Sequence, residues 1–307
     1  MTLPRISLAG ATGNLGAPIL SALLDANYPV TALTRQSSQS TSSLPNHPNL
    51  TIARVDFTSV ESLTSALQES QSDIVISALA TLAIGAQNPL IDAAVAAGVK
   101  RFIPAEFGMD SLNPLVRELP VCAPKAATQE YLQKKVEESG DGVFSWTGIA
   151  NGMFLDWCLE QGIILNLEER KATLYNGGDV VFSVALLRDV VRAVVGVAEN
   201  LEETRDRLVL VHSARVSQNQ LLEYAKERDG REWEVVVKST EDVKRESFEE
   251  LGKGEAADVE AAMLGFCIVG TWDTAYGCDF GARVDNGLFG VKELSEDELR
   301  EVVWGLM

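Results

Sequence analysis

The feature that most constrains this 307-residue chain is a glycine-rich stretch near its start. Residues 10–16 read Gly-Ala-Thr-Gly-Asn-Leu-Gly, between the apolar residues 6–9 and the largely apolar residues 17–24. A buried strand, a glycine turn and a helix in this order bind phosphate, because glycine admits a close pyrophosphate and the helix start offers free N–H groups. We predict a dinucleotide site here rather than a merely tight turn, with these binding residues: Gly10, Thr12, Gly13, Asn14, Leu15 and Gly16.

The residue at the end of the second predicted strand indicates which dinucleotide binds. Residues 28–35 form this strand and end on Arg35, with Ser37, Ser38 and Ser40 as candidate hydroxyl donors after it. An acidic residue at this place binds the ribose 2′-hydroxyl of NAD, whereas an arginine suits the 2′-phosphate of NADP. The alternative is an ordinary solvated arginine at a strand end. The sequence therefore favours NADP(H) as the cofactor.

Strands and helices alternate through the first half of the chain. Further strands are expected at residues 50–55, 74–78, 101–103 and 143–149, and helices at 60–69, 88–97 and 123–138. Repeated units of this kind need a parallel sheet that is covered on both faces. We predict an α/β fold with a Rossmann-type doubly wound parallel sheet, formed by a cofactor-binding domain of residues 1–150.

The pattern changes after about residue 151. Apolar and aromatic residues cluster at 153–157, a helix is expected at 186–199, and residues 241–260 read as a charged, solvated helix. Substrates of open parallel sheets bind outside the carboxyl ends of the strands. We expect residues 151–307 to form mainly a smaller C-terminal α/β substrate lobe, with some segments returning to the core sheet.

Charge and composition exclude several classes of partner. The formal net charge of −18 opposes binding to nucleic acid and to anionic membrane surfaces. The four cysteines form no C-x-x-C pair, and His47 and His212 lie in unrelated contexts without metal-ligand spacing. No apolar run approaches the length of a membrane span. We expect a cytoplasmic protein without a metal ion, working on a small molecule as a monomer or homodimer.

Three further segments carry a family resemblance. They are residues 92–108 (DAAVAAGVKRFIPAEFG), 146–154 (WTGIANGMF) and 284–290 (VDNGLFG). Over nearly its whole length the chain resembles the isoflavone reductase-like, NmrA-type atypical short-chain dehydrogenases/reductases, and especially their fungal members. The resemblance implies hydride transfer from NADPH to a phenylpropanoid or other small aromatic, often polyketide-like, substrate. It also implies that a lysine replaces the usual tyrosine as acid/base.

On this resemblance the acid/base residue is Lys125, early in the predicted helix of residues 123–138. A reductase must supply a proton as the hydride arrives. A competing pair is Tyr131 with Lys135, which literally matches the Tyr-x-x-x-Lys of ordinary short-chain dehydrogenases but lies more than one helical turn deeper. If Lys125 belonged to such a pair, its tyrosine would stand where the chain has Val121. A solvated lysine beside the helix start is the third interpretation.

Other site residues follow from the resemblance, although packing or capping would explain each of them equally well. Plant members often read Pro-Ser-Glu-Phe-Gly where this chain has Ala105, so one hydroxyl is missing. The expected adenine contacts are Asp56 and Phe57. The path from adenosine to nicotinamide would be lined by Ser77, Ala78 and Leu79. The nicotinamide and substrate would lie near Gln87, Glu106, Phe107, Asn151, Met153 and Phe154.

The substrate pocket is expected to be apolar and aromatic. Its candidate residues are Phe107, Met109, Met153, Phe154, Trp157, Trp272 and Tyr276. The same residues would serve equally well in an ordinary hydrophobic core.

Three functions remain open at this point. The first is an NADPH-dependent reductase, the second a non-catalytic NmrA-type regulator that senses NADP(H), and the third a non-redox isomerase or dehydratase. Fold alone does not separate them. Lys125 favours an enzyme, because a sensor needs no proton donor.

Overall fold

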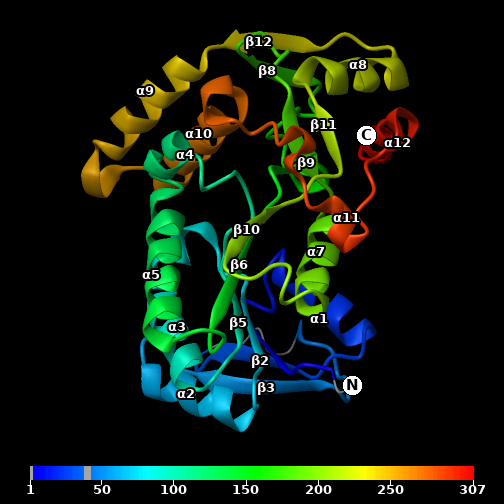
Figure 1. Ribbon diagram of the computed structural model, residues 1–307. Helices are drawn as coiled ribbons and strands as arrows, with labels where there is room; N and C mark the ends of the chain where they lie inside the picture. The colour runs from blue at the N-terminus through cyan, green and yellow to red at the C-terminus, as the bar shows by residue number, and fades with distance from the viewer. Residues whose placement is uncertain (1–2, 38–42) are drawn as a thin grey trace. The chain divides into compact units, whose positions relative to one another are not determined.

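The computed structural model describes residues 3–37 and 43–307, so Ser38 and Ser40 lie outside the described residues. The chain divides into two compact units (Figure 1). Unit 1 comprises residues 1–106, 124–149 and 191–209, and unit 2 comprises residues 107–123, 150–190 and 210–307. Residues 107–123 belong to unit 2 and residues 191–209 to unit 1. The division into a cofactor domain and a substrate lobe at residue 150 stays a prediction.

Unit 1 is built on a seven-stranded sheet with strand order β10-β6-β5-β4-β1-β2-β3. The strands are β1 (Ile6–Ala9), β2 (Val30–Arg35), β3 (Leu50–Val55), β4 (Ile74–Ser77), β5 (Arg101–Ile103), β6 (Ser145–Ala150) and β10 (Arg207–Leu210). All pairings from β3 through β6 are parallel. The strand order reverses between β1 and β4, which is where ligands bind in such sheets. The predicted Rossmann-type sheet is confirmed.

Helices cover both faces of this sheet. They are α1 (Gly16–Asp25), α2 (Val60–Glu69), α3 (Asn88–Ala96), α5 (Ala123–Ser139) and most of α7 (Leu187–Glu199). Figure 1 shows α1 and α7 on one side of the strands and α2, α3 and α5 on the other. Helix α1 buries Ile19, Leu20, Leu23 and Leu24, which share one face at helical spacing. Burial of each such side chain contributes about 1.5–3 kcal/mol.

Unit 2 contains two small sheets and several helices. One sheet has the order β11-β9-β7, formed by β7 (Met153–Phe154), β9 (Phe182–Ala185) and β11 (Ala214–Val216). The other pairs β8 (Lys171–Tyr175) in parallel with β12 (Glu234–Lys238). The α-helices are α4 (Pro114–Glu118), α6 (Leu155–Glu160), α8 (Gln218–Asp229), α9 (Thr240–Leu251), α10 (Val259–Trp272), α11 (Asn286–Phe289) and α12 (Glu296–Gly305). No helix in the described part of the chain is long and apolar enough to cross a membrane.

The single charged helix expected at residues 241–260 is wrong in its extent. Helix α9 ends at Leu251, and Gly254 follows with a φ of +62°, in the left-handed region that breaks a helix. A new helix, α10, then starts after Asp258, whose side chain accepts a hydrogen bond from the Ala261 N–H at 3.0 Å. Gly254 and the capping Asp258 therefore determine where the helices end and begin, and the charge pattern does not.

Arg101 on β5 is 1% exposed and ties the sheet to the segment after α7. Its guanidinium donates to the hydroxyls of Ser145 (2.8 Å), Thr147 (2.7 Å) and Thr204 (2.8 Å) and to the carbonyl of Leu201. Burial lowers the pKa of Arg101 to about 10. The buried guanidinium has lost its hydrogen bonds to water, and these bonds to neutral oxygens replace them.

Arg101→Met should lower the free energy of unfolding by about 2–4 kcal/mol, because it leaves several buried oxygens without a donor. The adjacent Lys100→Met is the matched control. Lys100 is exposed and pairs with Asp73 only at the surface, so we expect a change of about 0.5 kcal/mol or less. Denaturant unfolding measures both. Equal losses in the two variants would contradict a special role for the buried network.

Candidate functional site

In the glycine turn after β1, backbone carbonyl groups occupy the positions that side chains on Gly10 and Gly16 would need. Gly10 has a φ of +84°, and a Cβ on it would lie 2.3 Å from the carbonyl oxygen of Ala78. A Cβ on Gly16 would lie 2.0 Å from the carbonyl oxygen of Gly10. The N–H of Gly13 closes the turn by donating to that same carbonyl at 3.0 Å. The turn therefore requires glycine at its first and last positions.

Backbone N–H groups without an acceptor lie in the turn, directly before the start of α1. Thr12, Gly13 and Asn14 are exposed, and the N–H groups of Thr12, Asn14 and Leu15 have no acceptor among the described residues. No side chain caps α1, and its first turn contains no acidic residue. Free N–H groups and the positive end of the helix dipole together favour an anion such as a pyrophosphate.

Arg35 lies at the carboxyl end of β2, next to this turn. In the parallel register Ala9 pairs with Leu33, so Arg35 is level with the residue that follows Gly10. Its side chain is exposed and forms no ion pair within residues 3–37 and 43–307. Arg54 on β3 was not predicted; its guanidinium donates to the carbonyl of Gln36 at 3.0 Å and holds the segment after Arg35. Arg35 is thus an exposed cation at the carboxyl end of β2, on the strand next to β1.

Asp56 and Phe57 follow the end of β3. The Asp56 Oδ1 accepts hydrogen bonds from the Thr58 hydroxyl at 2.7 Å and the Thr58 N–H at 2.9 Å. These bonds lower the pKa of Asp56, so its exposed carboxyl is an acceptor at neutral pH. Phe57 is half-buried against the core of unit 1. The pair is open to an adenine but is also fully explained by its local contacts.

The end of β4 contains a buried hydroxyl without a partner. Ser77 is 0% exposed, and its Oγ has no hydrogen-bond partner in the described structure. The carbonyl of the next residue, Ala78, lies close to Gly10, and Leu79 packs against the core. An orphaned hydroxyl level with the glycine turn fits a bound polar ligand, because such groups are costly when left unpaired.

Gln87 is held by protein groups on both sides of its amide. It is 0% exposed, its Nε2 donates to the Ile84 carbonyl at 3.1 Å, and its Oε1 accepts from the Ala105 N–H at 3.0 Å. Gln87 therefore fixes the chain that leaves β5. The structure shows this positioning contact where the resemblance implied a cofactor contact.

Lys125 lies in the first turn of α5 and is 8% exposed. Its Nζ donates to the backbone carbonyl of Glu106, directly beyond the carboxyl end of β5. One turn later, Gln129 donates from Nε2 to Oε1 of Glu106 at 2.8 Å. Residues four apart share one helix face. Glu106 thus fixes both side chains, and Gln129 could have been found in the sequence by this spacing from Lys125.

Tyr131 and Lys135 face a different neighbour. The Tyr131 hydroxyl donates to Oδ1 of Asp92 on α3 at 2.7 Å, and the Lys135 Nζ lies 2.8 Å from the same oxygen. Burial and the Asp92 carboxylate raise the pKa of Tyr131, and Asp92 raises the pKa of Lys135. A proton-donating tyrosine needs a lowered pKa, so this pair is set up to join two helices rather than to catalyse.

Within unit 2, the segment that follows Glu106 has an unusual backbone. Phe107 has a φ of +32°, which is rare for a residue with a side chain. The carbonyl of Gly108 accepts hydrogen bonds from both Asn151 and Gly152, each at 2.9 Å. Asn151 is 0% exposed, and its Oδ1 has no partner in the part of the chain that the structure describes. Asn151 is therefore a second buried polar group available to a ligand.

The candidate substrate residues differ widely in exposure. Trp272 is 0% exposed and packs with Tyr175 and Phe182 at ring-centroid distances of 4.9 and 5.2 Å. Met109 and Met153 are buried in the same core, and Phe154 packs against it half-buried. Tyr276 is buried and accepts a hydrogen bond from Lys244 at 2.9 Å, whereas Trp157 is exposed. The alternative of an ordinary core accounts for Trp272, and Phe154 and Trp157 remain accessible.

His212 resembles a member of a hydrolytic triad only superficially. Its Nδ1 lies 3.0 Å from the Ser183 Oγ, and its Nε2 lies 3.2 Å from a carboxylate oxygen of Glu293. Ser183 is 0% exposed, and its Oγ also accepts the N–H of Phe280 at 3.0 Å. A nucleophile must reach its substrate. These contacts are therefore structural.

The family of the chain follows from comparison with known proteins. Residues 3–250 match the family described as NmrA-like. The chain belongs to the NmrA-like family. It is 36% identical over 262 residues to the oxidoreductase aprR of Aspergillus flavus, with 84% of this chain and 85% of aprR covered. It is 32% identical over 310 residues to the oxidoreductase poxI of Penicillium oxalicum, with coverages of 96% and 92%. The predicted family is confirmed.

The fold agrees with that of solved relatives. The AtPrR2 protein, solved with NADP⁺ and (+)pinoresinol, superposes with a TM-score of 0.71 at 20% identity, and the match covers 100% of both chains. At this identity the likeness concerns the fold. The NmrA-like chain thus shares its architecture with a protein that was solved with NADP⁺ and (+)pinoresinol.

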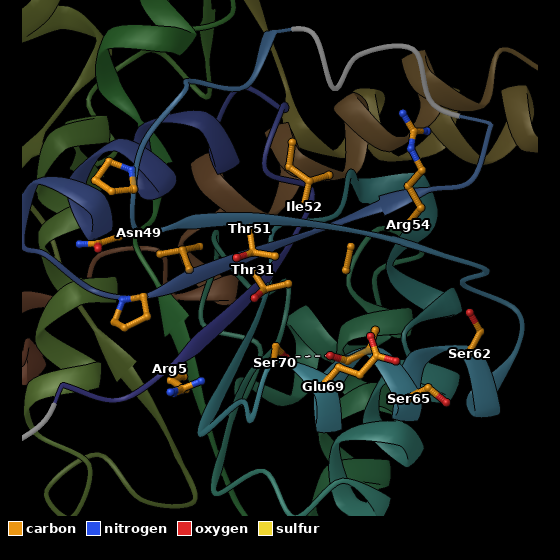
Figure 2. A pocket seen from close by; sticks show the side chains of 15 residues that line it. Arg5, Thr31, Asn49, Thr51, Ile52, Arg54, Ser62, Ser65, Glu69 and Ser70 are labelled. Atoms are coloured by element: carbon orange, nitrogen blue, oxygen red, sulfur yellow. Dashed lines mark hydrogen bonds between the residues drawn. The ribbon is translucent and has the colours of Figure 1, made fainter.

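A polar pocket of about 760 Å³ lies elsewhere in unit 1 of this NmrA-like protein (Figure 2). Thr31 and Thr51 of the strands face Ser65 and Glu69 of α2 across it, and Arg5 lies beside the amino ends of the strands. The glycine turn follows the carboxyl end of β1, at the other end of the sheet. The glycine turn is not among the lining residues, whereas Arg54, which binds the Gln36 carbonyl after Arg35, is one of them.

Gly10→Ala should destabilise unit 1, because its Cβ would meet a backbone carbonyl and its positive φ disfavours a side chain. We expect a loss of about 1–3 kcal/mol of unfolding free energy, measured by denaturant titration. Gly85→Ala is the matched control, since a Cβ there meets nothing within 4 Å. A Gly10→Ala variant as stable as the control would show that the turn relaxes without cost.

Proposed function

We propose that this NmrA-like protein is an NADPH-dependent reductase of a small aromatic, phenylpropanoid- or polyketide-like substrate, with Lys125 as acid/base. Two relatives that cover most of its length are named oxidoreductases. A protein of the same fold was solved with NADP⁺ and (+)pinoresinol. These names support the reaction class, and the residues of this chain support the detail.

The residues of unit 1 suit NADP(H). The free N–H groups of Thr12, Asn14 and Leu15 would bind the pyrophosphate, and Arg35 would bind the 2′-phosphate. The unpartnered Ser77 hydroxyl would accept or donate one further hydrogen bond. When bound, the cofactor supplies a hydride from its nicotinamide ring.

The observation that carries the acid/base assignment is the burial and fixation of Lys125. Its side chain is 8% exposed, and its Nζ is tied to the Glu106 carbonyl at the carboxyl end of β5, the edge where ligands of such sheets bind. An ammonium group has three N–H donors. The bond to Glu106 uses one of them, so the group can be oriented and still hold a proton for the oxygen of a substrate.

Unit 2 contains side chains whose chemistry suits such a substrate. Asn151 offers an unpartnered Oδ1, which would accept a hydrogen bond from a phenolic hydroxyl. Phe107 and Phe154 are half-buried and present aromatic surface for packing. A hydrogen-bond acceptor together with aromatic side chains suits a planar, hydroxylated substrate.

Lys125→Met should lower kcat/KM about 100-fold or more while the Kd for NADPH stays nearly unchanged, because it removes a proton donor and keeps the length of the side chain. NADPH oxidation is followed by absorbance with a panel of aromatic ketones, enones and phenylpropanoid ethers. Lys135→Met, a lysine on the same helix that binds Asp92, is the matched control and should keep its activity.

Undiminished turnover by Lys125→Met would refute the acid/base role. If the wild type binds NADPH but consumes none with any compound, the protein is a sensor or a non-redox enzyme. Product analysis by mass spectrometry then distinguishes these two, since an isomerase or dehydratase changes its substrate without consuming NADPH.

Arg35→Asp should weaken NADPH about 10- to 100-fold and leave NADH nearly unaffected, because it removes charge-assisted hydrogen bonds to a phosphate that NADH lacks. Lys134→Asp on the exposed side of α5 makes the same change in net charge and serves as the control. Binding is measured by cofactor fluorescence. Equal weakening of both cofactors would show that Arg35 does not discriminate between them.

A further inference from the structure

Strand β12 in unit 2 exposes three successive valines. Val235, Val236 and Val237 are 40%, 53% and 64% exposed, so both faces of this strand are apolar and open. Among the described residues β12 pairs only with β8, and Figure 1 shows the two strands side by side. An apolar strand at the edge of a sheet is a template for another strand.

The hydrogen bonds to β8 show which backbone groups of β12 remain available. The Glu234 N–H donates to the Arg170 carbonyl at 3.0 Å, and the Lys238 carbonyl accepts from the Asn176 N–H at 3.0 Å. Alternate residues of a strand direct their backbone groups to opposite edges. Glu234, Val236 and Lys238 therefore bond to β8, while Val235 and Val237 direct their N–H and C=O groups to the open edge.

The other edge of the same sheet is closed. Lys171 exchanges two backbone hydrogen bonds with Asn166, at 2.9 and 3.1 Å. The Gln218 side chain accepts from the Tyr175 N–H and donates to the Thr173 carbonyl, both at 2.8 Å. The two-stranded sheet can therefore be extended on one side, at β12.

The sequence of β12 is complementary to itself when it is reversed. In Glu-Val-Val-Val-Lys, antiparallel pairing about Val236 places Glu234 opposite Lys238 of the partner subunit and Val235 opposite the partner's Val237. The hydrogen-bonded pairs then consist of Val235 and Val237, whose backbone groups are the available ones. The closer, non-hydrogen-bonded positions hold the oppositely charged pairs, where side-chain interaction is strongest.

We propose that β12 pairs antiparallel with β12 of a second copy of this chain, with Val236 on the two-fold axis. The result is a four-stranded sheet, β8-β12-β12-β8, with both outer edges closed, so association stops at a dimer. Lys238 already pairs with Glu246 at 2.5 Å and keeps 36% of its side chain exposed for Glu234 of the partner subunit. The net charge of −18 on each chain opposes association at long range and is screened by salt.

Substitution of Val236, the residue at the two-fold axis, provides a specific test. Val236→Lys places two like charges opposite each other and should raise the dimer Kd about tenfold or more. Val236→Glu should do the same, whereas an equal mixture of the two variants should form a heterodimer. Sedimentation velocity at 0.15 M salt over a range of concentrations measures all three, and circular dichroism checks that the fold is kept.

The matched control is Ile52→Lys. Ile52 is an exposed apolar residue on β3, the edge strand of the seven-stranded sheet. This substitution should leave the dimer unchanged. Monomeric wild-type protein at all concentrations would overturn the proposal. So would a dimer that persists in Val236→Lys, variants that fail to associate when mixed, or open-ended polymers in place of a dimer.

Discussion

The close crossing of two backbone segments at Gly10 is the constraint on which unit 1 depends. The Ala78 carbonyl occupies the place of a Gly10 side chain, and the Gly10 carbonyl occupies the place of a Gly16 side chain. These contacts join β1, β4 and the start of α1 into one rigid corner. The free N–H groups and the Ser77 hydroxyl belong to the segments that meet at this crossing, and β2 with Arg35 pairs directly with β1.

Much of unit 1 could be predicted because its signals are local. Alternating apolar runs and the glycine turn located β1 to β5 and their helices within a few residues. The strand expected at residues 143–149 is less accurate at its start. Val143 is exposed in a turn, and β6 starts only at Ser145. In unit 2 the strands are short and the helices change direction at single residues such as Gly254 and Asp258, so charge pattern alone misled.

Site residues were predictable as identities and less so as contacts. Lys125 lies early in α5 as expected and is buried, but the sequence did not indicate that Glu106 would bind α5. The acid/base role of Lys125 stays a prediction. Gln87 likewise bonds to Ala105 rather than standing open. Such contacts join residues distant in sequence, and neither periodicity nor propensity contains that information. Aromatic identity also failed to separate Trp272, a core residue, from Trp157 at the surface.

The two bonds from α5 to Glu106 restrict how this family member can tolerate changes in length. Lys125 and Gln129 reach the carbonyl and the carboxylate of one residue from one face of the helix. A single inserted residue between them would turn one by about 100° relative to the other and break the arrangement. Insertions within residues 107–123 leave this helical phase intact. The helical phase that aligns Lys125 with Gln129 is therefore independent of the length of that segment, whose own Val116 and Leu119 are buried in the core of unit 2.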